Sequence, residues 1–318
     1  MVKGPYSGID KSSPLGESLE DFLNDTVAPT LDGQRPNWSE FTNVMDRGEI
    51  ERLRDKTNGK EELIKRKDED WETGVLGEWV VLQGLRSGWF GGAEVEAHPT
   101  SKYDDYFKGT DIVCEFKVGE EVVPLAIDIT TADATGGRDP MRAAATIYNK
   151  IERIEKRAKQ GLHPGVLEFH KSHMGEGRII GRDEMLKAVV VLSPADVFRL
   201  SELTRRIFED GDEGAREELV NDSSRYDVLA QILAAIRQSR EFASKVVRAQ
   251  GQGKTKEEIN IASQVISEAE TLEKILEEVG SQGELKIENQ LVDLIYTGRV
   301  PEELLKAIKE KKLDDVFI

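Results

Sequence analysis

Apolar residues recur at helical spacing across residues 71–88. They are Val75, Trp79, Leu82 and Leu85. Steps of three and four residues place them on one face of a helix, and the pattern stops at Gly88, a residue type common at helix C-termini. We therefore expect an amphipathic helix that packs through this face.

Shorter runs with β-branched residues follow this helix and are typical of strands. They cover residues 93–99, 109–119 and 120–132. Residues 139–161 then show a long helical pattern, which Asp139 can cap with Pro140 in the first position. After an irregular passage containing GVLEFHKS and GRIIGRDE, the apolar run KAVVVLS predicts another strand, and a helix follows it. The order helix, three strands, helix, strand predicts an α/β sandwich.

The two ends of the chain have a different texture. Residues 1–37 are rich in Gly, Pro, Ser and Asp, which predicts a mobile arm with one short helix at SLEDFLND. The following segment, up to about residue 66, is polar and helical. We therefore expect three parts: an arm with peripheral helices over residues 1–66, an α/β core over 67–210, and a helical accessory region over 211–318.

No strand pattern is evident beyond residue 211. Residues 225–247 and 256–280 predict two long helices, and two short helices are expected at 285–296 and 301–312. In the second long helix, apolar residues step alternately by three and four, as in a coiled coil. These residues are Ala262, Val265, Ala269, Leu272, Leu276 and Val279. The pattern predicts an antiparallel helical hairpin, through which the chain can also form a homodimer.

Composition narrows the class of protein. The chain of 318 residues has a net charge of -17 and a hydrophobic fraction of 38%, without a long uncharged apolar run. These values exclude a membrane span and argue against non-specific coating of nucleic acid. The first residues lack the apolar core of a signal peptide, so we expect a cytoplasmic protein. Its single cysteine, Cys114, lies in an apolar strand, which favours a buried structural thiol.

An acidic residue stands at the end of the third predicted strand, VVPLAIDITT. Side chains alternate between the two faces of a strand, so Ala126, Asp128 and Thr130 share one face while Ile127 and Ile129 share the other. A buried carboxylate is costly unless it is paired, hydrogen-bonded or bound to a metal. The sequence therefore predicts a partner for Asp128.

Two more carboxylates can reach the same place. Asp111 begins the preceding strand, and an antiparallel hairpin would bring it to Asp128. Glu78 lies on the helix before the strands, directly after Gly77, a small residue that allows the helix to approach the sheet. Carboxylates that meet repel one another unless a cation lies between them.

These residues and their order resemble the PD-(D/E)XK nuclease superfamily. The matching positions are Glu78 in LGEWV, Asp111 in KGTDIV, and Asp128, Ile129 and Thr130 in the third strand. The resemblance implies a restriction-endonuclease-like αβββαβ core with a mixed central sheet. It also implies a Mg²⁺ or Mn²⁺ ion held by Asp111, Asp128 and the backbone carbonyl of Ile129, with Glu78 nearby, that activates water for attack on a phosphodiester.

The chain departs from the family at one position. The superfamily places a lysine two residues after the second Asp, where this chain has Thr130. Threonine carries no charge, so three readings stay open: an inactive site, a lysine supplied from elsewhere, or catalysis by metal with a polar third residue. Lys150 on the following helix is the best candidate for the displaced lysine, and Thr130 then serves as a positioning hydroxyl.

Structural explanations compete for each acidic residue. Asp111 can cap a strand through local hydrogen bonds, Asp128 can begin a turn, and Glu78 can be a solvated helix residue. Tyr103, Asp104 and Asp105 precede the site and are candidates for substrate contact, but an exposed acidic turn is the simpler explanation.

Other charged and histidine-containing stretches are weaker candidates for binding sites. Arg138 and Arg142, at the start of a basic helix, are candidates for contact with a nucleic-acid backbone. A second cationic stripe around Arg237 and Arg240 can grip a duplex or pair with the Glu-rich neighbouring helix. Three histidines, His163, His170 and His173, suggest zinc, but without a cysteine pair a polar loop is favoured.

The sequence therefore predicts a Mg²⁺- or Mn²⁺-dependent nuclease that acts on nucleic acid, with DNA favoured over RNA. Its catalytic set is Glu78, Asp111, Asp128, Thr130 and Lys150. The alternatives are an inactive nuclease-fold binding module and a helical interaction scaffold. No membrane partner is expected.

Overall fold

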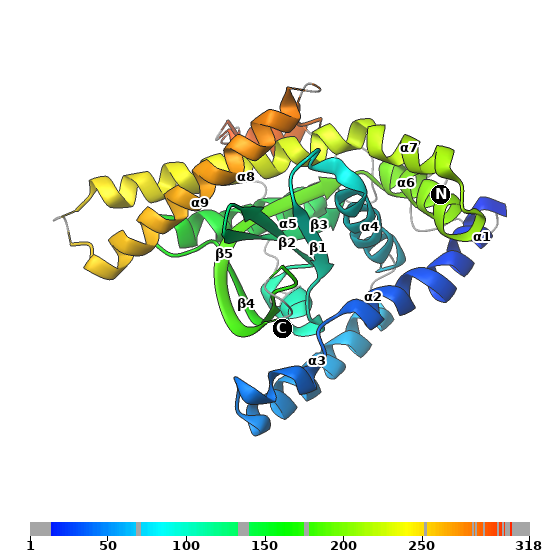
Figure 1. The fold of residues 1–318 in the computed structure, drawn as a ribbon, viewed down its shortest axis with the longest axis horizontal. Helices are drawn as coiled ribbons and strands as arrows, with labels where there is room; N and C mark the ends of the chain where they lie inside the picture. Colours follow the sequence, from blue (N-terminus) through cyan, green and yellow to red (C-terminus); the bar gives the residue numbers. More distant parts are fainter. Residues whose placement is uncertain are drawn as a thin grey trace.

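The computed structural model describes residues 14–67, 71–132, 140–174, 178–250 and 253–281, and beyond these 283, 285–288, 290–297, 299–300, 302 and 306. Within them, a five-stranded sheet is surrounded by helices, so the α/β class expected from the pattern is confirmed (Figure 1). The predicted helix over 301–312 lies almost entirely outside the described residues.

The sheet is mixed. Its strands are β1 (Val95–Pro99), β2 (Ile112–Val118), β3 (Glu121–Thr131), β4 (Gly165–Lys171) and β5 (Ile179–Leu192), in the spatial order β1-β2-β3-β5-β4. β3 and β5 are parallel, whereas the other neighbouring pairs are antiparallel. The helices α4 (Trp71–Gly84) and α5 (Pro140–Lys159) precede β1 and follow β3, as the pattern predicts.

The passage expected to be irregular forms strands instead. GVLEFHKS contains β4, and GRIIGRDE contains the first residues of a β5 that is twice as long as its apolar run. The apolar pattern is interrupted there because Gly181 has a φ of 77° and the β4–β5 ladder shifts register near His170. Such bulges bend a strand, and they break the alternation by which a strand is recognised.

Helix α4 lies close to the sheet. A Cβ atom at Gly77 would lie 2.7 Å from the Thr131 hydroxyl oxygen of β3, so any larger residue would have to displace the Thr131 side chain. Gly77 thus allows α4 to approach the sheet closely, as the sequence predicts. This approach brings Glu78, the next residue, to the end of the sheet at which Asp111 and Asp128 lie.

The part of β5 that extends past β4 has its free edge covered by side chains. Gln231 of α8 (Ser223–Arg248) accepts a hydrogen bond from the Val191 amide and donates one to its carbonyl. The Tyr296 hydroxyl of α10 (Gln290–Tyr296) does the same for Val189. These two side chains replace the missing strand and satisfy buried backbone groups.

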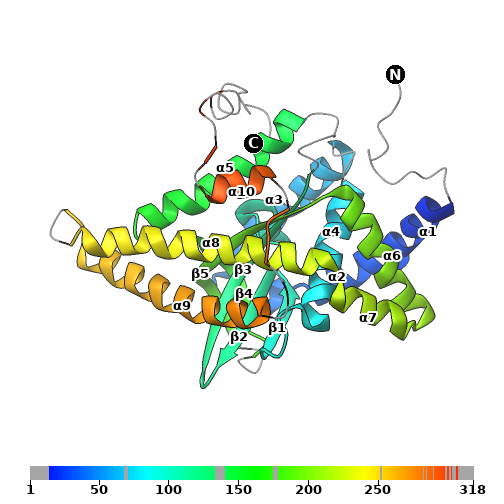
Figure 2. The ribbon, with the colours of Figure 1, turned by 90° about the horizontal axis from the view of Figure 1, so that it is seen from above.

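The long helices form the predicted hairpin. α8 packs along α9 (Lys256–Gly280), and all six residues of the proposed seam are buried (Figure 2). The cationic stripe faces this partner, because Arg240 lies 2.6 Å from Glu273 and Arg237 lies 2.7 Å from Glu277. Of the two readings of that stripe, the structure supports pairing with the neighbouring helix.

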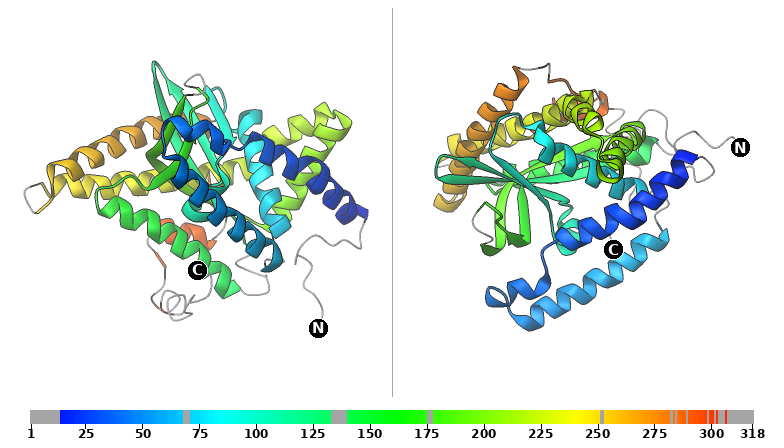
Figure 3. Two further views of the ribbon diagram at one scale, coloured as in Figure 1. Left: turned by 90° about the horizontal axis from the view of Figure 1, so that it is seen from below. Right: turned by 45° about the vertical axis from the view of Figure 1, so that its right-hand side comes forward.

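Of the arm expected over residues 1–37, residues 1–13 lie outside the described part of the chain, and residues 14–34 are helical, including the short helix predicted at SLEDFLND. α1 (Pro14–Phe22), a π-helical turn (Leu23–Val27) and α2 (Ala28–Gln34) run beside the core, and α3 (Arg47–Lys67) follows (Figure 3). Phe22, Leu23 and Leu31 are buried in the same hydrophobic core as the sheet and the C-terminal helices. The apolar residues of this segment are few and are interrupted by Gly and Pro, so they show little helical periodicity. The sequence pattern therefore predicts a mobile arm. The three expected parts thus share one core.

Two further α-helices follow β5 in the described chain. α6 (Pro194–Asp210) begins at Ser193, whose hydroxyl accepts a hydrogen bond from the Asp196 amide, as expected for a helix cap. α7 (Glu213–Asn221) was not predicted, because its polar sequence has only Ala215 and Leu219 to bury.

Candidate carboxylate site

Asp111, directly before β2, lies beside Asp128 of the paired strand β3. Ile112 pairs with Ile127, and the Asp111 amide donates to the Ile127 carbonyl over 2.9 Å. The Ile129 amide in turn donates to the Asp111 carboxylate over 2.5 Å. Burial and the nearby charges of Asp105 and Asp128 raise the pKa of Asp111 well above its usual range.

Lys150 reaches this carboxylate pair from helix α5. Its ammonium nitrogen lies 2.5 Å from Asp128 Oδ1 and 2.6 Å from the Thr130 hydroxyl. Burial alone would lower the pKa of Lys150, but the carboxylates of Asp128 and Asp111 outweigh it and raise the pKa. The structure thus places Asp111, Asp128, Thr130 and Lys150 together, as the sequence predicts.

Lys187 is a second cation at Asp128 that the sequence analysis missed. It lies on β5, and its ammonium nitrogen donates to the Lys108 carbonyl over 2.9 Å and to the Gly109 carbonyl over 2.5 Å. The same nitrogen lies 3.7 Å from Asp128 Oδ2. Burial lowers the pKa of Lys187. Its place on the same sheet face as Asp128 follows from the parallel β3–β5 pairing, which the sequence does not reveal.

Arg35 is the third cation, and it pairs with Glu78. The guanidinium Nη2 lies 2.9 and 3.0 Å from the two Glu78 carboxylate oxygens and 3.2 Å from Asp105 Oδ2. Its Nη1 donates to the Thr100 carbonyl over 2.9 Å. Burial raises the pKa of Glu78 to about 7 and that of Asp105 to about 6, while Arg35 opposes both shifts.

The segment before β2 is not the exposed acidic turn that the sequence suggests. Asp104 is fully buried and accepts hydrogen bonds from the Ser101 hydroxyl and from the backbone amides of Glu168 and Phe169 on β4. Asp105 faces Arg35. Local polarity suggested exposure, but this turn anchors β4 to the site.

The donor set fits a hard divalent cation only in part. Asp111 and Asp128 offer carboxylate oxygens from adjacent strands, the ligand type that Mg²⁺ and Mn²⁺ prefer. Glu78, expected as a third ligand, forms a two-pronged ion pair with Arg35 instead. Because three cations lie among four carboxyl groups, most of the negative charge is already balanced.

Other expected contacts are placed less fully. Ile129 lies on β3 opposite Val190, and its carbonyl as a metal ligand stays a prediction. Arg138 lies outside the described residues, and the side chain of Arg142 is not described either. Their contact with nucleic acid therefore stays a prediction. Cys114 is fully buried on β2, as expected for a structural thiol.

No protein-family model, curated protein or solved structure matches this chain. Across the described residues, every helix is too short or too polar to cross a lipid bilayer. A function is therefore inferred from the geometry of the site alone.

Proposed function

We propose that this protein is a metal-dependent phosphodiester hydrolase that acts on nucleic acid. The observation that carries the proposal is the position of Lys150, whose ammonium group contacts both Asp128 and Thr130. An ammonium group from α5 thereby occupies the neighbourhood in which the PD-(D/E)XK pattern expects its lysine. The order α4, three antiparallel strands and α5, with β5 parallel to β3, further supports this assignment.

Each residue of the site has a distinct role in this proposal. Asp111 and Asp128 would hold Mg²⁺ or Mn²⁺, which supplies an activated water and balances charge on the phosphate. Lys150 orients the attacking water and stabilises negative charge, because its ammonium is held between a carboxylate and a hydroxyl. Thr130 accepts a hydrogen bond from Lys150 and fixes its direction.

The raised pKa of Asp111 is compatible with metal binding at this site. Asp111 has a raised pKa because it is buried beside two other carboxyl groups. A divalent cation favours the ionised carboxylate, so binding would release a proton from this group. Lys187 donates hydrogen bonds to the carbonyls of Lys108 and Gly109, and it thereby supports the loop that precedes Asp111.

Cleavage assays test the proposal directly. The full chain is incubated with Mg²⁺ or Mn²⁺ and with single- and double-stranded DNA and RNA, and the products are resolved on gels. We expect cleavage that requires metal, falls at least about 100-fold in Asp128→Asn and falls about 10- to 100-fold in Lys150→Gln. Lys156→Gln, an exposed lysine on the same helix, is the matched control and keeps wild-type activity.

Circular dichroism establishes that each variant is folded before its activity is compared. Absence of cleavage by the wild-type chain on all four substrates with both metals would overturn the proposal. Activity that persists in Asp128→Asn would also count against it. Binding of nucleic acid without cleavage would favour the inactive binding module, in which Arg35, Lys150 and Lys187 permanently neutralise the carboxylates.

A further inference from the structure

A second polar cluster lies on the same face of the sheet as the carboxylate site. Asp111, Val113 and Glu115 alternate along the chain and share one face of the sheet. Val113 packs with Ala126, Leu167 and Met185 in a small apolar cluster that separates the two polar sites. Glu115 lies beyond this cluster, away from Asp111.

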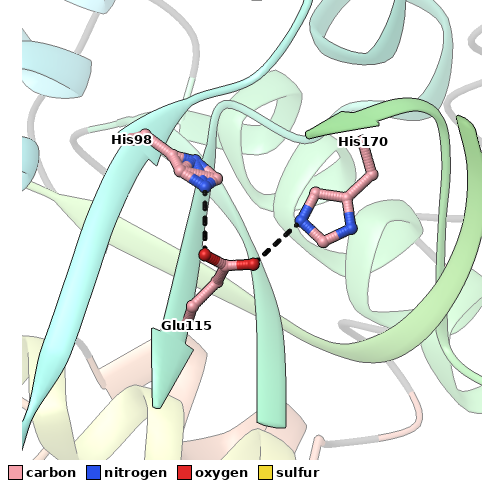
Figure 4. Close-up of side chains that lie close together, drawn as sticks. All are labelled: His98, Glu115 and His170. Atoms are coloured by element: carbon pink, nitrogen blue, oxygen red, sulfur yellow. Dashed lines mark ion pairs between the residues drawn. The ribbon is translucent and has the colours of Figure 1, made fainter. Parts of the chain in front are cut away.

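Glu115 meets two histidines from two other strands. His98 of β1 has Nε2 3.9 Å from Glu115 Oε2, and His170 of β4 has Nε2 3.4 Å from Glu115 Oε1 (Figure 4). The three side chains are only 5%, 1% and 2% exposed for His98, Glu115 and His170. They are the one group of three or more His, Cys, Asp or Glu side chains in the described part of the chain whose ligand atoms lie within 4.8 Å of one another.

The cluster contains buried polar atoms without hydrogen-bond partners. Four atoms are buried and have no hydrogen-bond partner among the described residues: both ring nitrogens of His98, Nε2 of His170 and Oε1 of Glu115. Buried polar atoms are nearly always paired, so an unpaired set that converges on one point indicates a missing ligand. A protonated His170 would form ion pairs with Glu115 and Asp183, but the ring nitrogens of His98 would still lack a hydrogen-bond partner.

The surrounding groups orient these atoms as ligands. Asp183 Oδ2 lies 2.7 Å from His170 Nδ1, which directs the other ring nitrogen at Glu115. The backbone amides of His173 and Met174 donate to Glu115 Oε2, which leaves Oε1 toward His170. The ring of His173 lies against that of His98 at a tilt of 34°, with centroids 4.1 Å apart. A carboxylate behind a ligating histidine is the usual support of a metal site.

We propose that His98, Glu115 and His170 bind one divalent transition-metal ion, with Zn²⁺ the preferred metal. Two imidazoles and one carboxylate suit Zn²⁺ and its first-row neighbours better than Mg²⁺ or Ca²⁺, which favour oxygen ligands throughout. Three protein ligands leave a coordination position for water. The sequence raises zinc binding for His163, His170 and His173 but favours a polar loop. Because β4 is a strand and not a loop, one of these residues, His170, is placed where it can bind zinc.

The metal would join the two edges of the sheet. β1 and β4 are at opposite ends of the strand order and share no ladder, yet their histidine rings lie 6.2 Å apart. The bent β5 carries β4 back over the sheet face, so one ion would connect β1, β2 and β4 (Figures 1 and 4). This site is separate from the proposed Mg²⁺ site and does not depend on it.

Metal titration of the full chain tests the inference. Protein freed of metal with a chelator is titrated with Zn²⁺ by calorimetry and with Co²⁺ by visible absorption. With Mg²⁺ in excess to occupy the proposed carboxylate site, we expect one equivalent of Zn²⁺ or Co²⁺ to bind and the melting temperature to rise. His98→Ala and His170→Ala should each weaken binding at least about 100-fold, and Asp183→Asn, which loses the supporting carboxylate, should weaken it about 10- to 100-fold.

Two control variants locate the bound ion. His163→Ala removes a buried histidine that lies beside Glu268 instead, and it should keep wild-type binding. Asp128→Asn should also keep it, which separates this site from the proposed nuclease centre. Binding that is lost in Asp128→Asn but kept in His98→Ala would overturn the inference, as would a wild-type chain that binds no Zn²⁺.

X-ray absorption of the Zn²⁺-loaded wild type keeps the test independent of how the variants fold. Two imidazole nitrogens in the coordination shell are expected. A shell of oxygen atoms alone would overturn the assignment of His98 and His170.

Discussion

Gly109 lies where a left-handed backbone meets the carboxylate site. Its φ is 61°, and a Cβ atom there would lie 2.9 Å from Asp128 Oδ2. The same residue offers its carbonyl to Lys187 over 2.5 Å. A single glycine thus lets the loop before Asp111 approach both the acid and its cation, which makes it a sensitive probe of the site.

Gly109→Ala should therefore destabilise the protein more than a substitution that changes only the backbone preference. Gly119 is the matched control, because its φ is 64° and a Cβ atom there meets nothing within 4 Å. We expect Gly119→Ala to cost about 1 kcal/mol and Gly109→Ala about 3 kcal/mol, the difference reflecting contact with Asp128. Denaturant unfolding measures both. Equal losses would show that Asp128 moves away freely.

Asp104 makes the free energy of unfolding depend on pH. Burial raises its pKa to about 6, against hydrogen bonds that favour the ionised form. An acid whose pKa is higher in the folded chain holds its proton more tightly when folded. Its contribution is therefore present at low pH and is lost as pH rises from about 4 to about 6, by up to about 3 kcal/mol.

Asp104→Asn should flatten this pH dependence. Unfolding curves at pH 4, 5, 6 and 7 compare the variant with wild type and with Asp55→Asn, an exposed control on α3. The wild type and the control should lose stability in parallel as pH rises through this window. A variant whose curve follows theirs would show that Asp104 is ionised at every pH tested.

At the scale of elements, β5 is the strand that organises the molecule. Its later residues pair with β3 in parallel and carry Lys187 to Asp128, while its earlier residues pair with β4 and bring His170 to Glu115. Where β5 extends past β4, the side chains of Gln231 and Tyr296 form hydrogen bonds with its free edge. One long bent strand therefore positions both polar sites.

Gln231→Leu should destabilise the protein although it adds no charge and little volume. The Val191 amide and carbonyl would lose their partners in the core, at about 2–4 kcal/mol for the two buried groups. Gln264→Leu, an exposed glutamine on α9, should change stability by less than about 0.5 kcal/mol. Amide hydrogen exchange reports the same event locally, because Val191 should exchange faster in the variant. Unchanged protection of Val191 would mean that another group takes the place of Gln231.

The sequence reveals the elements whose pattern is local and hides those that depend on distant packing. Asp111, Asp128 and Thr130 could be placed together because strand alternation and a short hairpin determine their positions. Lys187 and His170 could not, since they depend on the β3–β5 and β4–β5 pairings. Arg35 was missed for the same reason: its segment has few periodic apolar residues, and only tertiary packing brings it to Glu78.

At the scale of the whole molecule, the N-terminal helices are part of the carboxylate site. Arg35 follows α2 and pairs with Glu78 on α4 and Asp105 before β2. Phe22 and Leu31 anchor the same helices in the common core. The arrangement makes the ionisation state of the site depend on a segment more than forty residues away from Glu78 in sequence.

Arg35→Met should destabilise the protein by about 3–5 kcal/mol at pH 7, because it leaves Glu78 and Asp105 buried without their cation. Glu78→Gln in the same chain should recover part of this loss, since one of the two unpaired carboxylates is then neutral. The exposed Arg47→Met serves as the control. Denaturant unfolding of the single and double variants gives the coupling energy. Additive losses would show that Arg35 acts through packing alone.

The order in which the strands pair also bears on how the chain folds. Ile112 and Ile127, partners in the β2–β3 hairpin, are fifteen residues apart, whereas Leu125 and Leu186, partners in the parallel pair, are sixty-one apart. Closing the longer loop costs more entropy, so the hairpin is expected to form before β5 joins it. Asp111 and Asp128 would then meet before Lys187 arrives. Until Lys150, only 22 residues after Asp128, or Lys187 reaches the pair, mutual repulsion of these carboxylates would slow refolding, and mild acid or a divalent cation would speed it by neutralising them.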